Sequence, residues 1–257
     1  MTKQQYRLPL ALFTVSLFLP IFLLTNQPSQ GQESLEVVTQ TQSSPIPSKV
    51  NVTFKPPGKS KPDYTVGGAS RDSGRCPEDV RDFSPTLTGL MPDNQQGLSV
   101  AERPTFFVYV PATDAKKAFF SIKDKNEDYY YQTSVSLPST PGIISFQLPV
   151  DAPVLEIGKD YDWSFVMICG QALRPGDPEV RGIVKRIEQT PALKAKRENL
   201  SPLEIAATYG NEGVWFDTLA TIAQLRRSQP SNQALVSTWE EILKSVGLEE
   251  IATEPLL

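Results

Sequence analysis

Alternation of apolar and polar residues dominates the middle of the chain and predicts short β-strands. In Tyr161–Cys169 every second residue is apolar or aromatic, which places one continuous hydrophobic face on that strand. The other strand-like runs are Thr105–Val110, Ala118–Ile122, Tyr129–Leu137, Ile143–Leu148 and Gly182–Ile187. Turn-forming Pro, Gly, Asn and Asp separate these runs and no long helical period lies between them, so we expect mainly antiparallel pairing.

A helical period replaces this alternation near the end of the chain. Ser201-Pro202-Leu203-Glu204 has the form of a capping box with Pro at the first helical position. Apolar residues then recur at helical spacing from Val214 to Leu225, before Pro230, and from Leu235 to Val246, before Gly247. The pattern therefore predicts three helices after the strands.

These two patterns together predict the fold class α+β. We expect an antiparallel β-sandwich of immunoglobulin-like architecture over residues 66–189, a three-helix unit over 190–248 and a tail over 249–257. The Cys…Trp…Cys spacing of immunoglobulin domains is not reproduced, so the expectation concerns architecture and not that family.

The first 31 residues have the pattern of an export signal. Lys3 and Arg7 precede an apolar run from Leu8 to Leu24, and a small-residue site allows cleavage after Gly31. The run is long enough that a retained N-terminal anchor is the alternative, and both routes place the folded part outside the cytoplasmic membrane. Residues 32–65 are rich in Gln, Ser, Thr and Pro, which predicts a disordered linker, although Val50–Phe54 has the pattern of a short strand.

The composition of the chain excludes several classes of catalytic and metal site. Among 257 residues there is no histidine, which excludes Ser-His-Asp and Cys-His catalysis and histidine-ligated metals. The net charge of −4, without a long basic run, argues against binding of nucleic acid. The only two cysteines, Cys76 and Cys169, are expected to form a disulfide in an oxidising compartment, with two buried free thiols as the alternative.

Several acidic residues are candidates for a metal site or a catalytic site. Asp124-x-Asn126-x-Asp128 begins like a calcium loop, but Tyr129 and Val135 stand where that loop needs Gly and Glu, so we expect a polar turn. Carboxylate pairs for glycoside hydrolysis would be Asp160 with Asp162, or Glu127 with Asp128; we expect the first pair on a solvated strand face. No metal or cofactor is predicted.

The first two predicted helices resemble a tetratricopeptide-type hairpin. The residues that match its signature spacing are Ala206, Tyr209, Gly213, Thr218, Ile222, Leu225 and Pro230, of which Thr218 and Leu225 differ from the small residues usual there. Such a unit either docks on the sandwich or forms a groove for a partner peptide. The candidates for partner binding are Tyr209, Trp215, Arg226, Arg227 and Trp239.

A wider resemblance is carried by motifs spread over residues 66–248. They are Gly67-Gly68-Ala69-Ser70-Arg71, Cys76, Pro104–Pro111, Pro141-Gly142-Ile143, Tyr161-x-Trp163, Ile168-Cys169, Trp215-Phe216-Asp217-x-Leu219, Arg226-Arg227, Pro230, Trp239 and Val246-Gly247-Leu248. On these residues the chain resembles the largely cyanobacterial exported proteins of domain of unknown function family 928. The resemblance implies export and a β-then-α build, and it implies no activity and no catalytic residues.

These observations predict an exported, non-enzymatic binding or structural protein of the periplasm or cell envelope. The leading expectation is a protein partner in the envelope, bound through the helical unit or an exposed sheet edge. A carbohydrate or envelope-polymer binder, with Tyr129 and Tyr131 as an aromatic platform, is the alternative, and a histidine-free carboxylate hydrolase is the second alternative. Contact with a membrane is expected only through the N-terminal segment, if it is retained.

Overall fold

The computed structural model describes most of the chain from residue 50 onward. The described residues are 50–57, 74–80, 85–124, 126, 128–191, 194–195 and 199–257. The predicted export signal or anchor, residues 1–31, and most of the predicted linker lie outside them. Among the described residues, none of the helices combines the length and the apolar character needed to cross a membrane.

The described residues contain eight strands in two sheets, and the alternation predicts all of them except the two short strands before residue 105. The strands are β1 (Thr88–Gly89), β2 (Gln96–Ser99), β3 (Thr105–Val110), β4 (Lys117–Lys123), β5 (Tyr129–Ser136), β6 (Gly142–Gln147), β7 (Asp160–Ile168) and β8 (Glu179–Arg186). Sheet A has the order β1-β3-β6 and sheet B the order β2-β8-β7-β4-β5. All pairs are antiparallel except β2 with β8, which is parallel.

The helical part follows the strands. In the part of the chain that the structure describes it includes α2 (Pro202–Asn211), α3 (Trp215–Ser228) and α4 (Gln233–Lys244), with a 3₁₀ turn η1 (Glu249–Ile251) after them. The predicted capping box is present, because the Ser201 amide donates to the Glu204 carboxylate (2.7 Å) and the Glu204 amide donates to Ser201 Oγ (3.4 Å). The α+β class is thus confirmed, whereas the likeness to a tetratricopeptide hairpin stays a prediction.

Aromatic side chains fill the space between the two sheets. Phe106 of β3 lies 5.0 Å from Phe120 of β4 and 5.4 Å from Trp163 of β7, and Phe146 of β6 lies 4.7 Å from Phe120, all between ring centroids. Phe165 of β7 stacks on Phe146 at 5.6 Å. Such pairs add to the burial of apolar area, which is the main stabilising contribution in this layer.

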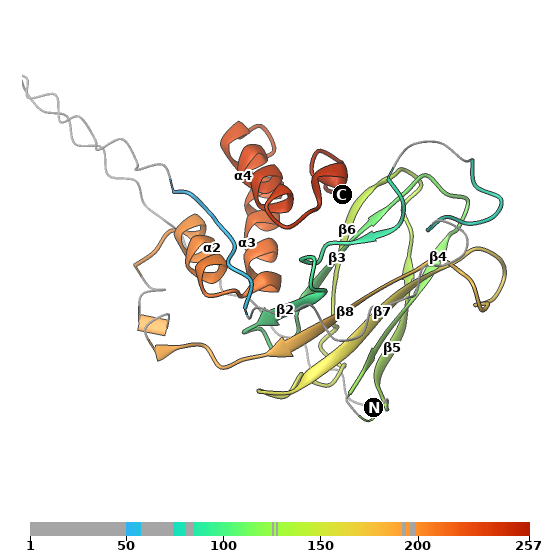
Figure 1. Cartoon of the computed structure of the whole chain (residues 1–257), viewed down its shortest axis with the longest axis horizontal. Helices are drawn as coiled ribbons and strands as arrows, with labels where there is room; N and C mark the ends of the chain where they lie inside the picture. The colour runs from blue at the N-terminus through green and yellow to red at the C-terminus, as the bar shows by residue number, and fades with distance from the viewer. Residues whose placement is uncertain are drawn as a thin grey trace, which may run out of the picture. The chain divides into compact units, whose positions relative to one another are not determined.

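Sheet A is covered on both faces, which distinguishes this protein from a two-layer sandwich. Phe107, on the opposite face of β3 from Phe106, packs against Trp239 of α4 with ring centroids 5.9 Å apart. Figure 1 shows α3 and α4 beside β3 and β6, with β7, β4 and β5 beyond them. The helices, sheet A and sheet B thus form three layers. An immunoglobulin-like arrangement is not confirmed, since β2 joins the sheet in parallel and helices cover sheet A.

Part of the predicted linker is packed against the helices, and this corrects the expectation of disorder for residues 50–57. Val52 and Phe54 are buried, and Phe54 lies 4.6 Å from the Trp215 ring. The Lys55 amide donates to the Gly210 carbonyl (3.0 Å). The alternating apolar residues dock on α2 and α3, and they do not form the short strand that the pattern suggested.

The predicted tail, residues 249–257, is also part of the fold. Ile251 and Ala252 are buried. Leu256 then forms a parallel bridge with Ile143, so that the chain extends sheet A beside β6. This burial of apolar side chains and pairing of backbone groups corrects the expectation of a tail.

The predicted disulfide is confirmed. Cys76 and Cys169 are bonded across a sequence separation of 93 residues, with their Cα atoms 5.3 Å apart. The bond ties the residues before β1 to the end of β7.

Candidate functional site

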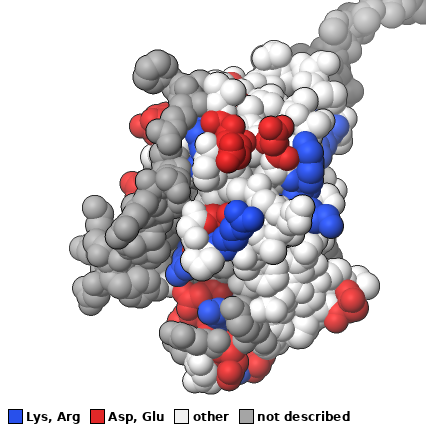
Figure 2. Space-filling model, turned by 90° about the vertical axis from the view of Figure 1, so that its right-hand side faces the viewer, with Lys and Arg blue, Asp and Glu red and all other residues white. Residues whose placement is uncertain are grey.

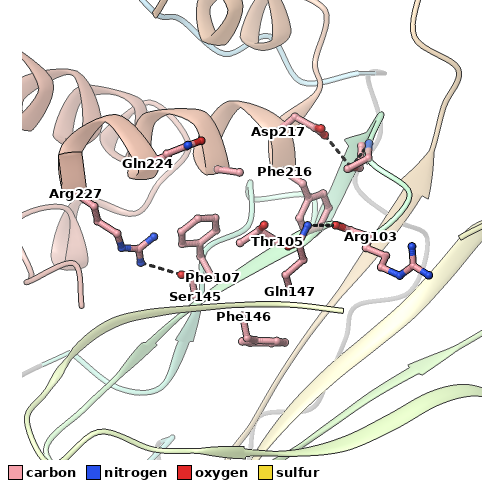
Figure 3. A pocket seen from close by; sticks show the side chains of 13 residues that line it. Arg103, Thr105, Phe107, Ser145, Phe146, Gln147, Phe216, Asp217, Gln224 and Arg227 are labelled. Carbon is pink, nitrogen blue, oxygen red and sulfur yellow. Dashed lines mark hydrogen bonds between the residues drawn. The ribbon is translucent and has the colours of Figure 1, made fainter. Parts of the chain in front are cut away.

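A cavity of about 620 Å³ lies between α3 and the helix-facing side of sheet A. Its volume is within the range of sites that take small ligands or short segments of a partner. Figure 3 shows α3 on one side of it and β6 on the other. The lining residues are Ser99, Ala101, Arg103, Thr105, Phe107, Ser145, Phe146, Gln147, Phe216, Asp217, Ala220, Gln224 and Arg227.

Strand alternation and pairing register place the floor of the cavity. Thr105 and Phe107 of β3 point toward the helices, because Phe106 between them points into the space between the sheets. In the antiparallel register Thr105 is opposite Gln147 and Phe107 is opposite Ser145. The four side chains therefore share one face and form a floor with one aromatic ring and three polar groups.

The opposite wall is one face of α3. Phe216, Ala220, Gln224 and Arg227 follow at intervals of four, four and three residues, which places them on one side of a helix. Phe216 also packs on Phe106, with ring centroids 5.3 Å apart. This wall is apolar near the start of α3 and polar toward its end.

Asp217 is the one carboxylate among the residues that line the cavity. Its Oδ2 atom accepts hydrogen bonds from Ser99 Oγ (2.8 Å) and from the Val100 amide (3.0 Å). Burial raises the pKa of this carboxyl, and the hydrogen bonds counteract only part of that effect. Its position in the first turn of α3 also favours the charged form, and desolvation nevertheless has the larger influence.

This raised pKa predicts a pH dependence that Asp217→Asn should remove. Because the folded state holds the proton more tightly than the unfolded state, wild-type stability is expected to fall as pH rises from about 4 through the raised pKa, and to level off above it. Asparagine keeps an acceptor oxygen for Ser99 and Val100 without this titration. Urea unfolding of both proteins at several pH values should show the variant gaining stability relative to wild type as pH rises. A constant difference would contradict the prediction.

Two arginines lie at the borders of the cavity. Arg227 Nη2 donates to Ser145 Oγ (2.8 Å) and to the main-chain oxygen of Leu257 (2.6 Å), and burial lowers its pKa. Arg103 donates from Nε to the Pro149 carbonyl (3.0 Å) and from Nη2 to the carbonyls of Val150 (2.9 Å) and Ala152 (3.0 Å). Its guanidinium is turned away from the other labelled side chains in Figure 3. Both guanidinium groups thus hold backbone segments at the ends of the site.

The cavity adjoins a sheet edge that already accepts an added segment. The Ile143 amide donates to the Pro255 carbonyl (2.7 Å), and the Leu257 amide donates to the Ile143 carbonyl (2.9 Å). Backbone groups in a strand alternate in direction, so those of Ser145 and Gln147 point to the same outer side as those of Ile143. As the order of sheet A makes β6 an edge strand, a further extended segment can pair there.

Three of the five predicted partner-binding residues are buried in the core, and this corrects their proposed role. Tyr209, Trp215 and Trp239 are at most 4% exposed and are not among the residues that line the cavity, so their side chains do not reach a partner bound there. The Trp215 indole donates to the Leu90 carbonyl (2.8 Å). Arg226 lies over the Trp239 ring at 5.4 Å. Arg227 alone of the five lines the cavity.

The other candidates do not come together at this cavity. Asp160 pairs with Lys185 of β8 (3.2 Å), and Asp162 is exposed. Asp124 accepts the amides of Asn126 (2.8 Å) and Asp128 (3.3 Å), as expected of a polar turn. Tyr131 is partly buried against the core; the side chain of Tyr129 and all of Glu127 lie outside the part that the structure describes.

The face of the molecule in Figure 2 carries both positive and negative side chains. On the face in Figure 2, Lys and Arg side chains are interspersed with Asp and Glu, and a largely uncharged area lies between them. Among the described residues no group of three or more cysteines and carboxylates could hold a metal ion. The cavity and the adjoining edge strand β6 are therefore the candidate functional site.

Most residues of this site have no signal in the sequence. Ser99, Arg103, Gln147 and Gln224 belong to different elements and form no local motif. Asp217 gave no distinguishing signal either, because an acidic residue in the first turn of a helix is common.

The model of a family described as Domain of Unknown Function (DUF928) matches residues 66–256. No curated protein matches the chain.

Proposed function

Because the chain belongs to the DUF928 family, whose domain has no known function, we propose a function from the site itself: an exported binding protein that holds an extended segment of a partner protein. The segment would lie along the edge of β6 with alternate side chains in the cavity. The observation that carries this proposal is the pairing of residues 255–257 with Ile143, next to a cavity of about 620 Å³. Main-chain pairing supplies affinity in such complexes, and the pocket supplies specificity.

Export is part of the proposal and rests on separate observations. The basic and apolar N-terminal pattern of residues 1–31 and the disulfide between Cys76 and Cys169 both fit an oxidising compartment outside the cytoplasm. The periplasm or the cell envelope is where we expect the partner.

A binding role also agrees better with the cavity than catalysis does. Glycoside hydrolysis uses two carboxyl groups about 5–10 Å apart, and Asp217 is the one carboxylate in the lining. The chain has no histidine to act as a general base, and both cysteines are in the disulfide. The lining is instead a mixture of aromatic, amide and hydroxyl groups, which is typical of recognition sites.

Gln224→Trp should block the site without disturbing the core, because Gln224 is exposed on α3 and lines the cavity. A library of linear peptides displayed on phage would be selected on the full chain. Selected peptides are expected to lose at least about tenfold in affinity for Gln224→Trp, since filling the cavity removes the side-chain contacts. Ser237→Trp is the matched control, because Ser237 is exposed on α4 and outside the lining.

Two results would overturn the proposal. One is a selection that yields no binding peptide, and the other is a set of peptides that bind both tryptophan variants as well as wild type. Polysaccharides from the envelope, offered to the same three proteins, test the alternative partner class. If no peptide binds, and a polysaccharide binds wild type but not Gln224→Trp, the cavity is a polysaccharide site and not a peptide site.

A further inference from the structure

Resting on the proposed function, we propose that the cavity selects a partner segment by a lysine or arginine side chain, whose cation meets Asp217 and whose aliphatic stem lies against the small accessible parts of Phe107 and Phe216. The three side chains come from β3 and α3 and line the same cavity. Figure 3 shows Phe216 and Phe107 between α3 and β6, with Asp217 at the end nearer Thr105.

Asp217 is a carboxylate without a described cation as its partner. The hydrogen-bond donors around it are neutral: Ser99 Oγ and the Val100 amide donate to Oδ2, and the main-chain amides of Asp217 and Ala101 contribute as well. Neutral donors orient the carboxylate but leave its charge uncompensated in a place where water is partly excluded. A cation from a ligand would compensate it, and a charge-assisted hydrogen bond is stronger in such surroundings than in water.

The aromatic rings favour the same class of side chain. Phe107 and Phe216 are both buried against the core, at 4% and 3% exposure, and the cavity meets the ring surface that remains. Lysine and arginine lay their methylene stems on apolar surface while the cation reaches a polar partner. A carboxylate beyond two aromatic rings therefore fits a long cationic side chain.

The two nearby arginines do not cancel this preference. Arg227 is ten residues after Asp217 on α3, which is about 15 Å along a helix, and its guanidinium donates to Ser145 Oγ and to the main-chain oxygen of Leu257. Arg103 lines the cavity, but three main-chain carbonyls of the β6–β7 connection occupy its guanidinium. Neither arginine donates a described hydrogen bond to Asp217.

The pairing register indicates where the cation stands in the segment. Leu256 pairs with Ile143 in parallel, so a segment that continues this line would have residues opposite Ser145 and Gln147, with their side chains on the helix side. Gln147 is opposite Thr105, at the end of the cavity nearer Asp217. The cationic residue is therefore expected at the position opposite Gln147, two residues after the one opposite Ser145.

Three blocked pentapeptides test this inference on the full chain. They have the sequence Thr-Val-X-Val-Thr, with X as lysine, norleucine or glutamate. Norleucine has the stem of lysine without its charge. NMR titration of wild type should show about tenfold tighter binding of the lysine peptide than of the norleucine peptide, and the weakest binding for glutamate.

Asp217→Asn should reduce the lysine-to-norleucine ratio to about one, because the amide keeps the hydrogen bonds to Ser99 and Val100 and lacks the charge. Glu241→Gln, which removes an exposed carboxylate of α4 outside the lining, should leave the ratio unchanged. Equal affinity of the lysine and norleucine peptides for wild type, or a ratio that persists in Asp217→Asn, would overturn the inference.

Failure of the inference and failure of the proposed function give different results. If the pentapeptides bind equally well and Gln224→Trp abolishes their binding, the proposed function stands and the cation preference is wrong. If Gln224→Trp abolishes the binding of none of the pentapeptides and none of the selected peptides, the cation preference and the proposed function are both wrong.

Discussion

Replacement of both cysteines by serine is expected to lower the free energy of unfolding by about 4–5 kcal/mol. Cys76 and Cys169 close a loop with a sequence separation of 93 residues, and a bond across a loop of this length removes much of the conformational freedom of the unfolded chain. Changing both residues, Cys76→Ser with Cys169→Ser, leaves no unpaired thiol.

Urea unfolding of the double variant and of wild type in oxidising buffer measures this difference. Wild type under reducing conditions is the control, and it should approach the stability of the double variant. Hydrogen bonds also hold the segment, since Asp79 Oδ1 accepts from Thr113 Oγ1 and from the Asp114 amide, both at 3.1 Å. A loss below about 1 kcal/mol would show that these contacts, and not the bond, fix the segment.

Trp215→Ala is expected to lower the free energy of unfolding by about 3–5 kcal/mol, the usual effect of removing a large buried aromatic side chain. Trp215 is fully buried, packs on Phe54 and donates its indole N–H to the Leu90 carbonyl (2.8 Å). It therefore joins three separate segments: residues 50–57, the connection after β1, and α3. Loss of the side chain leaves a cavity and an unpaired carbonyl.

The same variant separates a core role from the partner-binding role that the sequence suggested. A residue that binds a partner from the surface would lower affinity when replaced and leave stability nearly unchanged. Trp215→Phe, which keeps an aromatic ring and removes the hydrogen bond, should be destabilised less than Trp215→Ala. Urea unfolding of the three proteins checks the order, and a stability of Trp215→Ala within about 0.5 kcal/mol of wild type would contradict the account.

The fold was predictable where a local pattern is also the structural cause. Every second residue from Tyr161 to Met167 is buried, because sheet A covers one face of β7. A strand that is covered on one face has alternating apolar and polar residues, and the sequence shows this alternation directly. Ser201 and Glu204 form a capping box in the structure because the box is a local exchange of hydrogen bonds. The disulfide followed from the number of cysteines and the expected compartment.

The remaining features depend on contacts between distant segments. β2 has the sequence Gln-Gly-Leu-Ser, too short and polar to stand out, and Gly97 in it lies close to the Phe216 ring of α3. Phe54 belongs to residues 32–65, whose content of Gln, Ser, Thr and Pro predicts a linker, whereas its partner Trp215 lies far away in the sequence. Tyr209, Trp215 and Trp239, which were predicted to bind a partner, are buried. Their large aromatic side chains suit either role, because periodicity alone does not show which helix face is covered.

The candidate site was less predictable than the fold for the same reason. The cavity exists because α3 lies across β3 and β6 without filling the space between Phe107, Ala220 and Gln224. No spacing in the sequence encodes that gap. Arg227 was identified, but its neighbours in the site come from segments about a hundred residues earlier, such as Ser145 and Thr105.

The central claim is that an extended segment pairs with the edge of β6 beside the cavity, and hydrogen exchange of two backbone amides tests it most directly. The amides of Ser145 and Gln147 point to the outer side of β6, and the amide of Phe146 between them pairs with β3. In the presence of a saturating selected peptide, exchange of Ser145 and Gln147 should slow by at least about tenfold, while Phe146 changes little. Unchanged exchange at Ser145 and Gln147 with the peptide bound would contradict the claim.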